Sequence, residues 1–265
     1  MSASVAPFAG RVWRIAGAVC LRRLRDYLAF LLVLGLGWQL LILLLGLPPY
    51  LLPSPLLIAQ SLLGNADLIS SATATTLLAT LSGLAVAMAA AIALALMFMA
   101  APLSEEALMP LIVVVRTVPM IAIAPLLVLL FGRGSSNSIG MVALLSFFQI
   151  LLSAREGFQA PTRNMLELMH ANGAGFWQIF LKLRVPAAMP HLFTGLRIAS
   201  ASAILCAMFA EWLSGSEGLG SLILDAYSRQ DFALMWASVA TGTSVSYLFF
   251  TATMALERAV MDWNQ

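Results

Sequence analysis

Six apolar stretches, each long enough to cross a lipid bilayer, are separated in this chain by short polar connections. The hydrocarbon core of a bilayer is about 30 Å thick, which a helix of about 20 residues can span. Because lipid offers the backbone no hydrogen-bond partner, these stretches must be helices. We therefore predict an all-α, polytopic membrane protein with six transmembrane helices. The predicted spans are residues 27–47, 72–100, 107–131, 138–154, 191–213 and 232–257.

The composition excludes a soluble domain. Hydrophobic residues make up 61% of the 265 residues and charged residues only 10%, whereas soluble domains carry about 25% charged residues. We predict one transmembrane domain, residues 27–265, after a basic amino-terminal segment, residues 1–26. The formal net charge of +2 is too small to indicate a nucleic-acid surface, so the bilayer itself is the expected surrounding.

Basic residues are concentrated on one side of the predicted membrane. Five arginines precede the first span, which disfavours translocation of that flank. We therefore predict a cytoplasmic N-terminus, and counting spans from it places residues 155–190 in the cytoplasm too. That loop carries four more basic residues, whereas the predicted external segments carry only Arg133 and Arg229. The first apolar run is also too long for the apolar region of a cleaved signal peptide.

Residues 155–190 form the longest polar interruption between the spans, and their pattern predicts a helical hairpin. One helix is expected to end at Asn172-Gly173, where glycine permits positive φ, and a second short helix to follow. Phe176 and Trp177 lie near the tip of the hairpin, where aromatic side chains suit a groove in a partner. Pro186 is expected to stiffen the return to the membrane. The alternative is an amphipathic helix that rests on the bilayer surface.

The spacing within this loop resembles the cytoplasmic EAA loop of binding-protein-dependent ABC importer permeases. Glu167 is followed six positions later by Gly173, and Pro186 comes thirteen positions after that glycine. Leu168 and Met169 replace the two alanines of the family pattern, but the hairpin stays hydrophobic. The other segments that resemble the nitrate, sulfonate, taurine and bicarbonate branch, in the same order, are Leu51-Leu-Pro-Ser-Pro55, Arg116-Thr-Val-Pro119 with Pro125, Phe131-Gly132, Ala210-Glu211 and Gly218-Leu-Gly220.

This resemblance implies a type I importer permease (MetI-like) fold in a bacterial inner membrane. It implies the transmembrane permease subunit of an ATP-driven importer, with two copies of an ATP-binding subunit, a second copy of this chain and an extracytoplasmic substrate-binding protein as partners. The residues that it assigns to ATPase coupling are Glu167, Asn172, Gly173, Ala174, Gly175, Phe176, Trp177 and Pro186.

The sequence contains no phosphate-binding loop. Such a loop needs Gly-Lys followed by Ser or Thr, and Lys182 is flanked by two leucines. We therefore expect no catalytic residue and no cofactor in this chain, with ATP and Mg bound by a separate partner subunit. His170 and His191 are too far apart for helical metal spacing and have no matching cysteine or carboxylate cluster, so no metal site is expected.

Polar residues inside the spans are candidates for the translocation path. Arg116 lies nine residues after the predicted start of the third span, ahead of Pro119 and Pro125. A proline-broken helix there could turn a positive charge toward an aqueous path. The alternative is that Arg116 reaches the cytoplasmic headgroups or pairs with Glu105 or Glu106.

Glu211 is a second candidate for the path, near the external mouth. It continues a series of small residues at four-residue spacing, which lets a neighbouring helix approach closely. The alternative for Glu211 is a structural role, as a cap or in an ion pair with Arg229. The two small-residue stripes are Gly83, Ala87, Ala91 and Ala95 in the second span, and Gly195, Ala199, Ala203 and Ala207 in the fifth.

The substrate is the least determined feature. We expect a small anion such as a sulfonate, nitrate or bicarbonate, and a pyrimidine or vitamin precursor is the alternative within the same importer class. Two other classes stay open at this point. A secondary transporter would need ion-coupling residues in the spans, which are nearly free of ionisable groups. A non-transporting scaffold would give no reason for the hairpin.

Overall fold

A computed structural model describes the backbone of residues 6–46 and 48–261, and the side chains of residues 25–27, 29–46 and 48–261. Within these residues the regular structure is helical throughout, which confirms the all-α prediction. The elements are α1 (Ala6–Leu45), α2 (Pro55–Gly64), α3 (Ala66–Ala100), α4 (Pro102–Thr117), α5 (Met120–Phe131), α6 (Ser135–Gln159), α7 (Arg163–Ala171), α8 (Phe176–Ile179), the π-helical η1 (Phe180–Arg184), α9 (Val185–Ser214), α10 (Leu219–Ser228) and α11 (Phe232–Val260).

Five helical stretches in the described part of the chain are long and apolar enough to cross a membrane. The pair α4 and α5 makes a sixth candidate, bent by 102° at its centre. The polytopic architecture predicted from the sequence is therefore confirmed. The five unbroken candidates are Arg25–Leu45, Ala66–Ala100, Ser135–Gln159, Phe176–Ser214 and Phe232–Val260.

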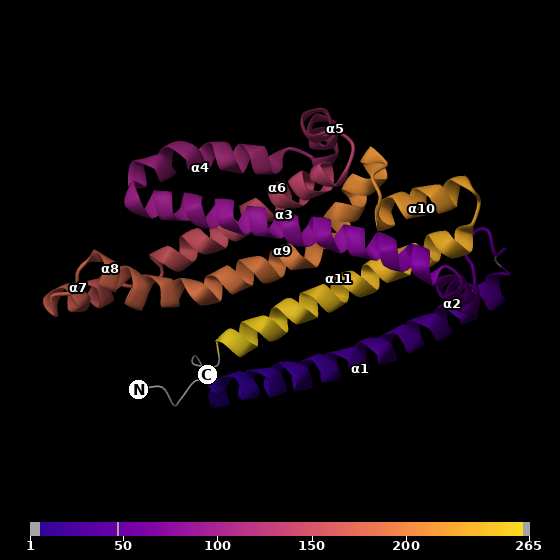
Figure 1. Cartoon of the computed structure of the whole chain (residues 1–265), viewed down its shortest axis with the longest axis horizontal. Helices are drawn as coiled ribbons and strands as arrows, with labels where there is room; N and C mark the ends of the chain where they lie inside the picture. Colours follow the sequence, from indigo (N-terminus) through magenta and orange to yellow (C-terminus); the bar gives the residue numbers. More distant parts are fainter. Residues whose placement is uncertain (1–5, 47, 262–265) are drawn as a thin grey trace.

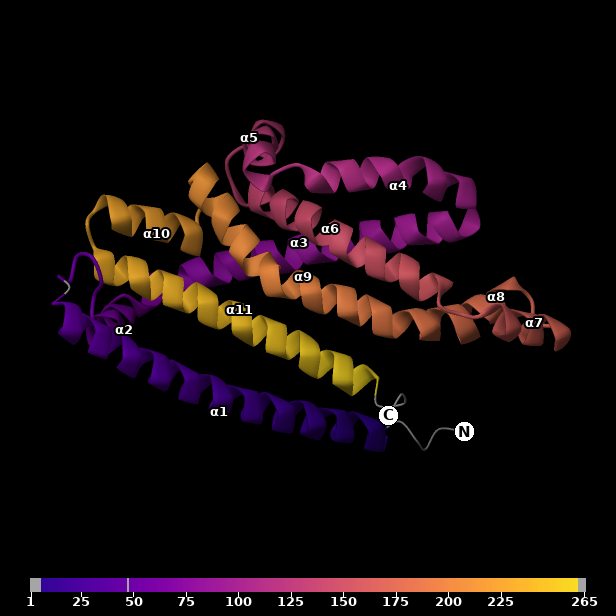
Figure 2. The same cartoon turned by 180° about the vertical axis from the view of Figure 1, so that it is seen from behind.

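The long helices run along one common direction, and short helices lie at the two ends (Figure 1). Helices α7 and α8 lie at one end, where α1 begins and α11 finishes, and we call this the hairpin end. Helices α2 and α10 lie at the opposite end, and the view from behind shows the same arrangement (Figure 2). Helix α5 lies across the bundle, away from both ends.

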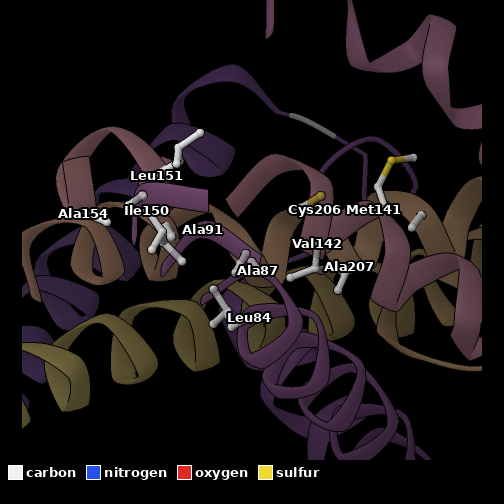
Figure 3. Packing of buried hydrophobic residues seen from close by; sticks show 14 of the residues in the cluster. Leu84, Ala87, Ala91, Met141, Val142, Ile150, Leu151, Ala154, Cys206 and Ala207 are labelled. Carbon is white, nitrogen blue, oxygen red and sulfur yellow. The ribbon is translucent and has the colours of Figure 1, made fainter. Parts of the chain in front are cut away.

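Helix α6 packs between α3 and α9 at the centre of the fold. All eight residues of the two small-residue stripes are buried. A Cβ placed on Gly83 would lie 2.7 Å from Val142 Cβ, and one on Gly195 would lie 2.7 Å from Ser153 Cβ, so both glycines contact α6 directly. Leucine, alanine and methionine side chains fill the space between these helices (Figure 3). The prediction that the stripes are packing faces is confirmed.

The third predicted span is not one straight helix. Val118 and Pro119 adopt extended backbone (φ −65°, ψ 126° and φ −57°, ψ 129°), which separates α4 from α5. A proline disfavours the helical conformation of the residue before it, because its ring crowds the backbone of that residue. The predicted 107–131 span therefore consists of two helices, and the expected break at Pro119 is confirmed.

Helix α1 is attached to α11 through aromatic side chains. The rings of Tyr27 and Tyr247 stack with their centres 4.3 Å apart, and the Tyr27 hydroxyl donates a hydrogen bond to Ser244 Oγ at 2.8 Å. Nearer the opposite end, Trp38 packs edge-to-face on Trp236 at 5.0 Å. The leucines on the outer face of α1 are exposed, which suits contact with lipid acyl chains.

Candidate functional site

The polar loop folds into the predicted helical hairpin. Thr162 begins α7 by accepting a hydrogen bond from the Met165 amide at 3.4 Å. Gly173 ends the turn with φ +70°, a conformation that glycine adopts without strain. The Asn172 side chain closes the last turn of α7 by donating to the Leu168 carbonyl at 2.8 Å. The next helix, α8, begins at Phe176, three residues after the glycine.

The tip of the hairpin exposes aromatic side chains. Phe176 is 64% exposed and Trp177 is 68% exposed, and their rings pack edge-to-face on each other with centres 5.5 Å apart. Ala174 and Gly175 join the turn to this pair, and the Gly175 amide donates to Gln178 Oε1 at 3.2 Å. Glu167 lies apart from the tip, exposed on α7, where it pairs with Arg163 at 2.8 Å.

A stack of three phenylalanines fixes the hairpin to the body of the bundle. Phe176 stacks on Phe180 with ring centres 6.3 Å apart, and Phe180 stacks on Phe158 of α6 at 6.2 Å. Arg184 strengthens the junction by donating to the Phe158 carbonyl at 3.2 Å. The tip is therefore connected through side chains to the end of α6. The sequence analysis did not find Phe158 or Phe180, although both lie within residues 155–190, because the order of residues does not show that the two rings meet.

The hairpin continues into the membrane without a break. Helix α8 leads into η1, where the Val185 amide donates to the Phe180 carbonyl five residues earlier, and η1 leads directly into α9. Pro186 lies in the first turn of α9, and Pro190 lies inside it. The predicted start of the fifth span at residue 191 was therefore too late. A proline in the first turn lacks only an amide hydrogen that has no helical partner there, so the helix tolerates it.

Helix α4 is fixed to α6 at the hairpin end. Glu105, in the first turn of α4, forms an ion pair with Arg155 and accepts a hydrogen bond from Gln159 Nε2 at 3.0 Å. The alternative pairing of Glu105 with Arg116 was therefore wrong. The two residues are eleven positions apart on one helix, which places them about 16 Å apart along its axis.

Arg116 lies at the end of α4, beside the break. Its side chain is exposed, and it makes no ion pair within the residues whose side chains are described. A cavity of about 80 Å³ opens at the bend between α4 and α5. Arg116 and Gln149 are its polar lining residues, and apolar side chains of α4, α5 and α6 form the rest. Pro119 begins α5 at the bend, and Pro125 lies within α5, exposed.

Glu211 is buried in the protomer, with 1% of its surface exposed. Its Oε2 atom accepts hydrogen bonds from the Thr76 hydroxyl at 3.0 Å and from the Gly220 amide at 2.9 Å. The Leu219 amide donates in turn to Thr76 Oγ1 at 3.0 Å. Glu211 and Thr76 thus hold the first turn of α10 against α9 and α3. This geometry favours the structural alternative for Glu211, and the expected ion pair with Arg229 does not form among the described side chains.

Residues 83–262 match the family of binding-protein-dependent transport system inner membrane components. This stretch includes the hairpin, the bend beside Arg116, and Glu211 with the Gly220 amide that donates to it, whereas Thr76 lies before it. The chain belongs to this family of ABC importer permeases. With its candidate spans, the permease is a multi-pass inner membrane protein, and the family resemblance seen in the sequence is confirmed.

The relatives of the permease are named for different substrates. It is 34% identical to a formylaminopyrimidine transport permease protein of Halalkalibacterium halodurans, over 89% of this chain and 94% of that protein. A riboflavin transport system permease protein of Chloroflexus aurantiacus is 32% identical over 88% of each chain. A taurine transport system permease protein of Escherichia coli is 27% identical over 58% of this chain and 56% of that protein. Both substrate classes considered from the sequence therefore occur among its relatives.

Proposed function

We propose that the hairpin of α7 and α8 is the surface through which ATP-binding subunits drive this importer permease. The observation that carries the proposal is the exposed pair Phe176 and Trp177 at the start of a helix that continues into the membrane. Large aromatic side chains exposed together in water mark a contact surface, and such residues supply most of the binding energy in interfaces. The coupling role also includes Glu167, which with Arg163 stabilises α7 beside the turn.

The hairpin end faces the cytoplasm in this proposal. Arg163, Lys182 and Arg184 lie in or beside the hairpin, and basic residues are retained on the cytoplasmic side. Helices α2 and α10 at the opposite end then face outward, where an extracytoplasmic binding protein delivers the solute. Helix α4 buries none of its residues within the protomer, so its free side is available to a second copy of the chain, which would complete the path.

The substrate proposed from the relatives is a pyrimidine or vitamin precursor. The formylaminopyrimidine and riboflavin permeases match nearly the full chain at 34% and 32% identity, whereas the taurine permease matches 58% of it at 27%. A small anion is the second candidate, and the observation that favours it is the positive charge of Arg116 at the bend without an ion-pair partner among the described side chains.

The experiment that tests the proposal removes the aromatic tip. We expect the double variant Phe176→Ala, Trp177→Ala to lose the ATP-binding subunit on co-purification, because a buried aromatic contact contributes about 2 kcal/mol or more, roughly 30-fold in affinity. The matched control is Leu103→Ala, which removes another apolar side chain, 78% exposed, from the hairpin end. Equal recovery of the subunit by the double variant and the control would contradict the proposal, as would ATP hydrolysis by the permease alone.

A further inference from the structure

The cavity at the α4–α5 bend has the composition of a binding site. Its walls are apolar, with Met120 and Ile123 from α5 and Phe148 from α6 among them, and only Arg116 and Gln149 supply long polar side chains. Sites for small molecules are commonly apolar, with a few polar groups that fix orientation. At about 80 Å³ the cavity is smaller than the roughly 300–1,000 Å³ of sites that enclose a whole ligand. It has room for one end of a solute.

Arg116 places at this cavity a positive charge that no described acidic side chain pairs with. Along the axis of α4 it lies about 21 Å from the first residue of that helix, by a rise of about 1.5 Å per residue. That distance exceeds the length of its side chain, so Arg116 does not reach the hairpin end. The nearest acid in the same helix, Glu106, is ten positions away, and Glu105 already pairs with Arg155. Since Arg116 forms no ion pair with the described side chains, its guanidinium can bind an acceptor on a solute.

The side-chain amide of Gln149 is the second polar group at the cavity. Its Oε1 atom is buried and has no hydrogen-bond partner among the described residues, although the side chain lines the cavity. A buried carbonyl oxygen without a donor is destabilising, and a ligand or water that donates to it removes that cost.

We infer that this cavity holds one end of the transported solute, with Arg116 and Gln149 as the residues that select it. The inference rests on the proposed transport function and adds the substrate chemistry. The solute carries a hydrogen-bond acceptor for Arg116 beside an N–H or O–H donor for Gln149, on a flat body that packs on Phe148. The edge of an aminopyrimidine or an amide-bearing heterocycle meets this description. A sulfonate group, which has only acceptors, leaves the Gln149 oxygen unpaired.

The test uses the permease reconstituted in proteoliposomes with its ATP-binding subunit and binding protein. Labelled formylaminopyrimidine, riboflavin and ethanesulfonate, which has only acceptors, serve as the three probes. We expect the wild type to take up the first or second in preference to ethanesulfonate. Gln149→Leu is expected to lower that uptake at least tenfold, mainly through a higher KM, and Arg116→Gln at least as much.

The matched control is Ser146→Ala on the same helix. Ser146 Oγ is also buried, without a hydrogen-bond partner in the part of the chain that the structure describes, but it does not line the cavity. Its removal should therefore leave uptake unchanged. If Gln149 had only a structural role, Gln149→Leu would transport normally, because replacing an amide whose oxygen is unpaired with an apolar side chain stabilises the fold. Normal uptake by Gln149→Leu, a preference for ethanesulfonate, or uptake of none of the probes would overturn the inference. Failure of the ATP-binding subunit to co-purify with the wild type would instead overturn the proposed function.

Discussion

Gly220→Ala is expected to destabilise the permease more than the same substitution at other glycines. A Cβ at this position would lie 1.9 Å from the Met208 carbonyl oxygen, which belongs to the backbone of α9 and cannot turn aside. Helix α10 must then move away from α9, and the Gly220 amide loses its 2.9 Å hydrogen bond to Glu211. Overpacking costs roughly 1–3 kcal/mol, and an unpaired buried carboxylate oxygen costs about as much again. We expect a loss of about 3 kcal/mol or more in the free energy of unfolding.

Cys206 supplies the measurement. It lies in α9 with 4% of its surface exposed, so a thiol reagent reaches it only when the helices separate. In a Cys20→Ser background, the temperature of half-maximal labelling should fall strongly for Gly220→Ala. The control is Gly64→Ala, at the end of α2, where an added Cβ meets no atom within 4 Å. Equal labelling temperatures for the two variants would show that α10 is not held by the contacts around Glu211.

The architecture was predictable because lipid imposes a simple rule on the sequence. Long apolar runs must be helices, and stripes such as Gly83 to Ala95 show which face packs, so spans and packing faces could both be read from residue order. Pro119 identified the break in the third span, but its angle of 102° depends on where α5 finds packing partners on α6 and α9. Helix α9 begins before the predicted span because Pro186 and Pro190 conceal its first turns in the sequence.

The site was predictable only where it lies in a contiguous motif. The turn at Gly173 and the aromatic tip were evident from the loop itself. Gln149, Phe158 and Thr76 were missed because the residues around each of them belong to other helices. The spacing of residues along one helix does not show which helices lie beside it. Glu211 shows the converse case. A carboxylate in a span suggested the path, but its two donors come from α3 and α10, which only the folded structure brings together.

Insertion of one alanine between Lys182 and Leu183 is expected to reduce ATP-driven uptake at least 100-fold while the ATP-binding subunit stays bound. Each added residue turns a helix by about 100° and lengthens it by about 1.5 Å. The insertion therefore rotates α8 relative to α9 and removes Phe180 from its stack on Phe158. Since η1 is already wound with five-residue hydrogen bonding, it has little capacity to absorb another residue. The tip itself, with Phe176 and Trp177, remains intact.

Two measurements on the reconstituted complex separate binding from transmission. Recovery of the ATP-binding subunit reports docking at the tip, and uptake per ATP hydrolysed reports whether movement of the tip reaches α9. The control Lys182→Ala changes an exposed side chain at the same place without altering the helical register, and it should keep both quantities near the wild-type level. If the insertion variant transported as well as this control, the orientation of α8 on α9 would be irrelevant, and the force would have to enter the membrane domain through α7 and α6 instead.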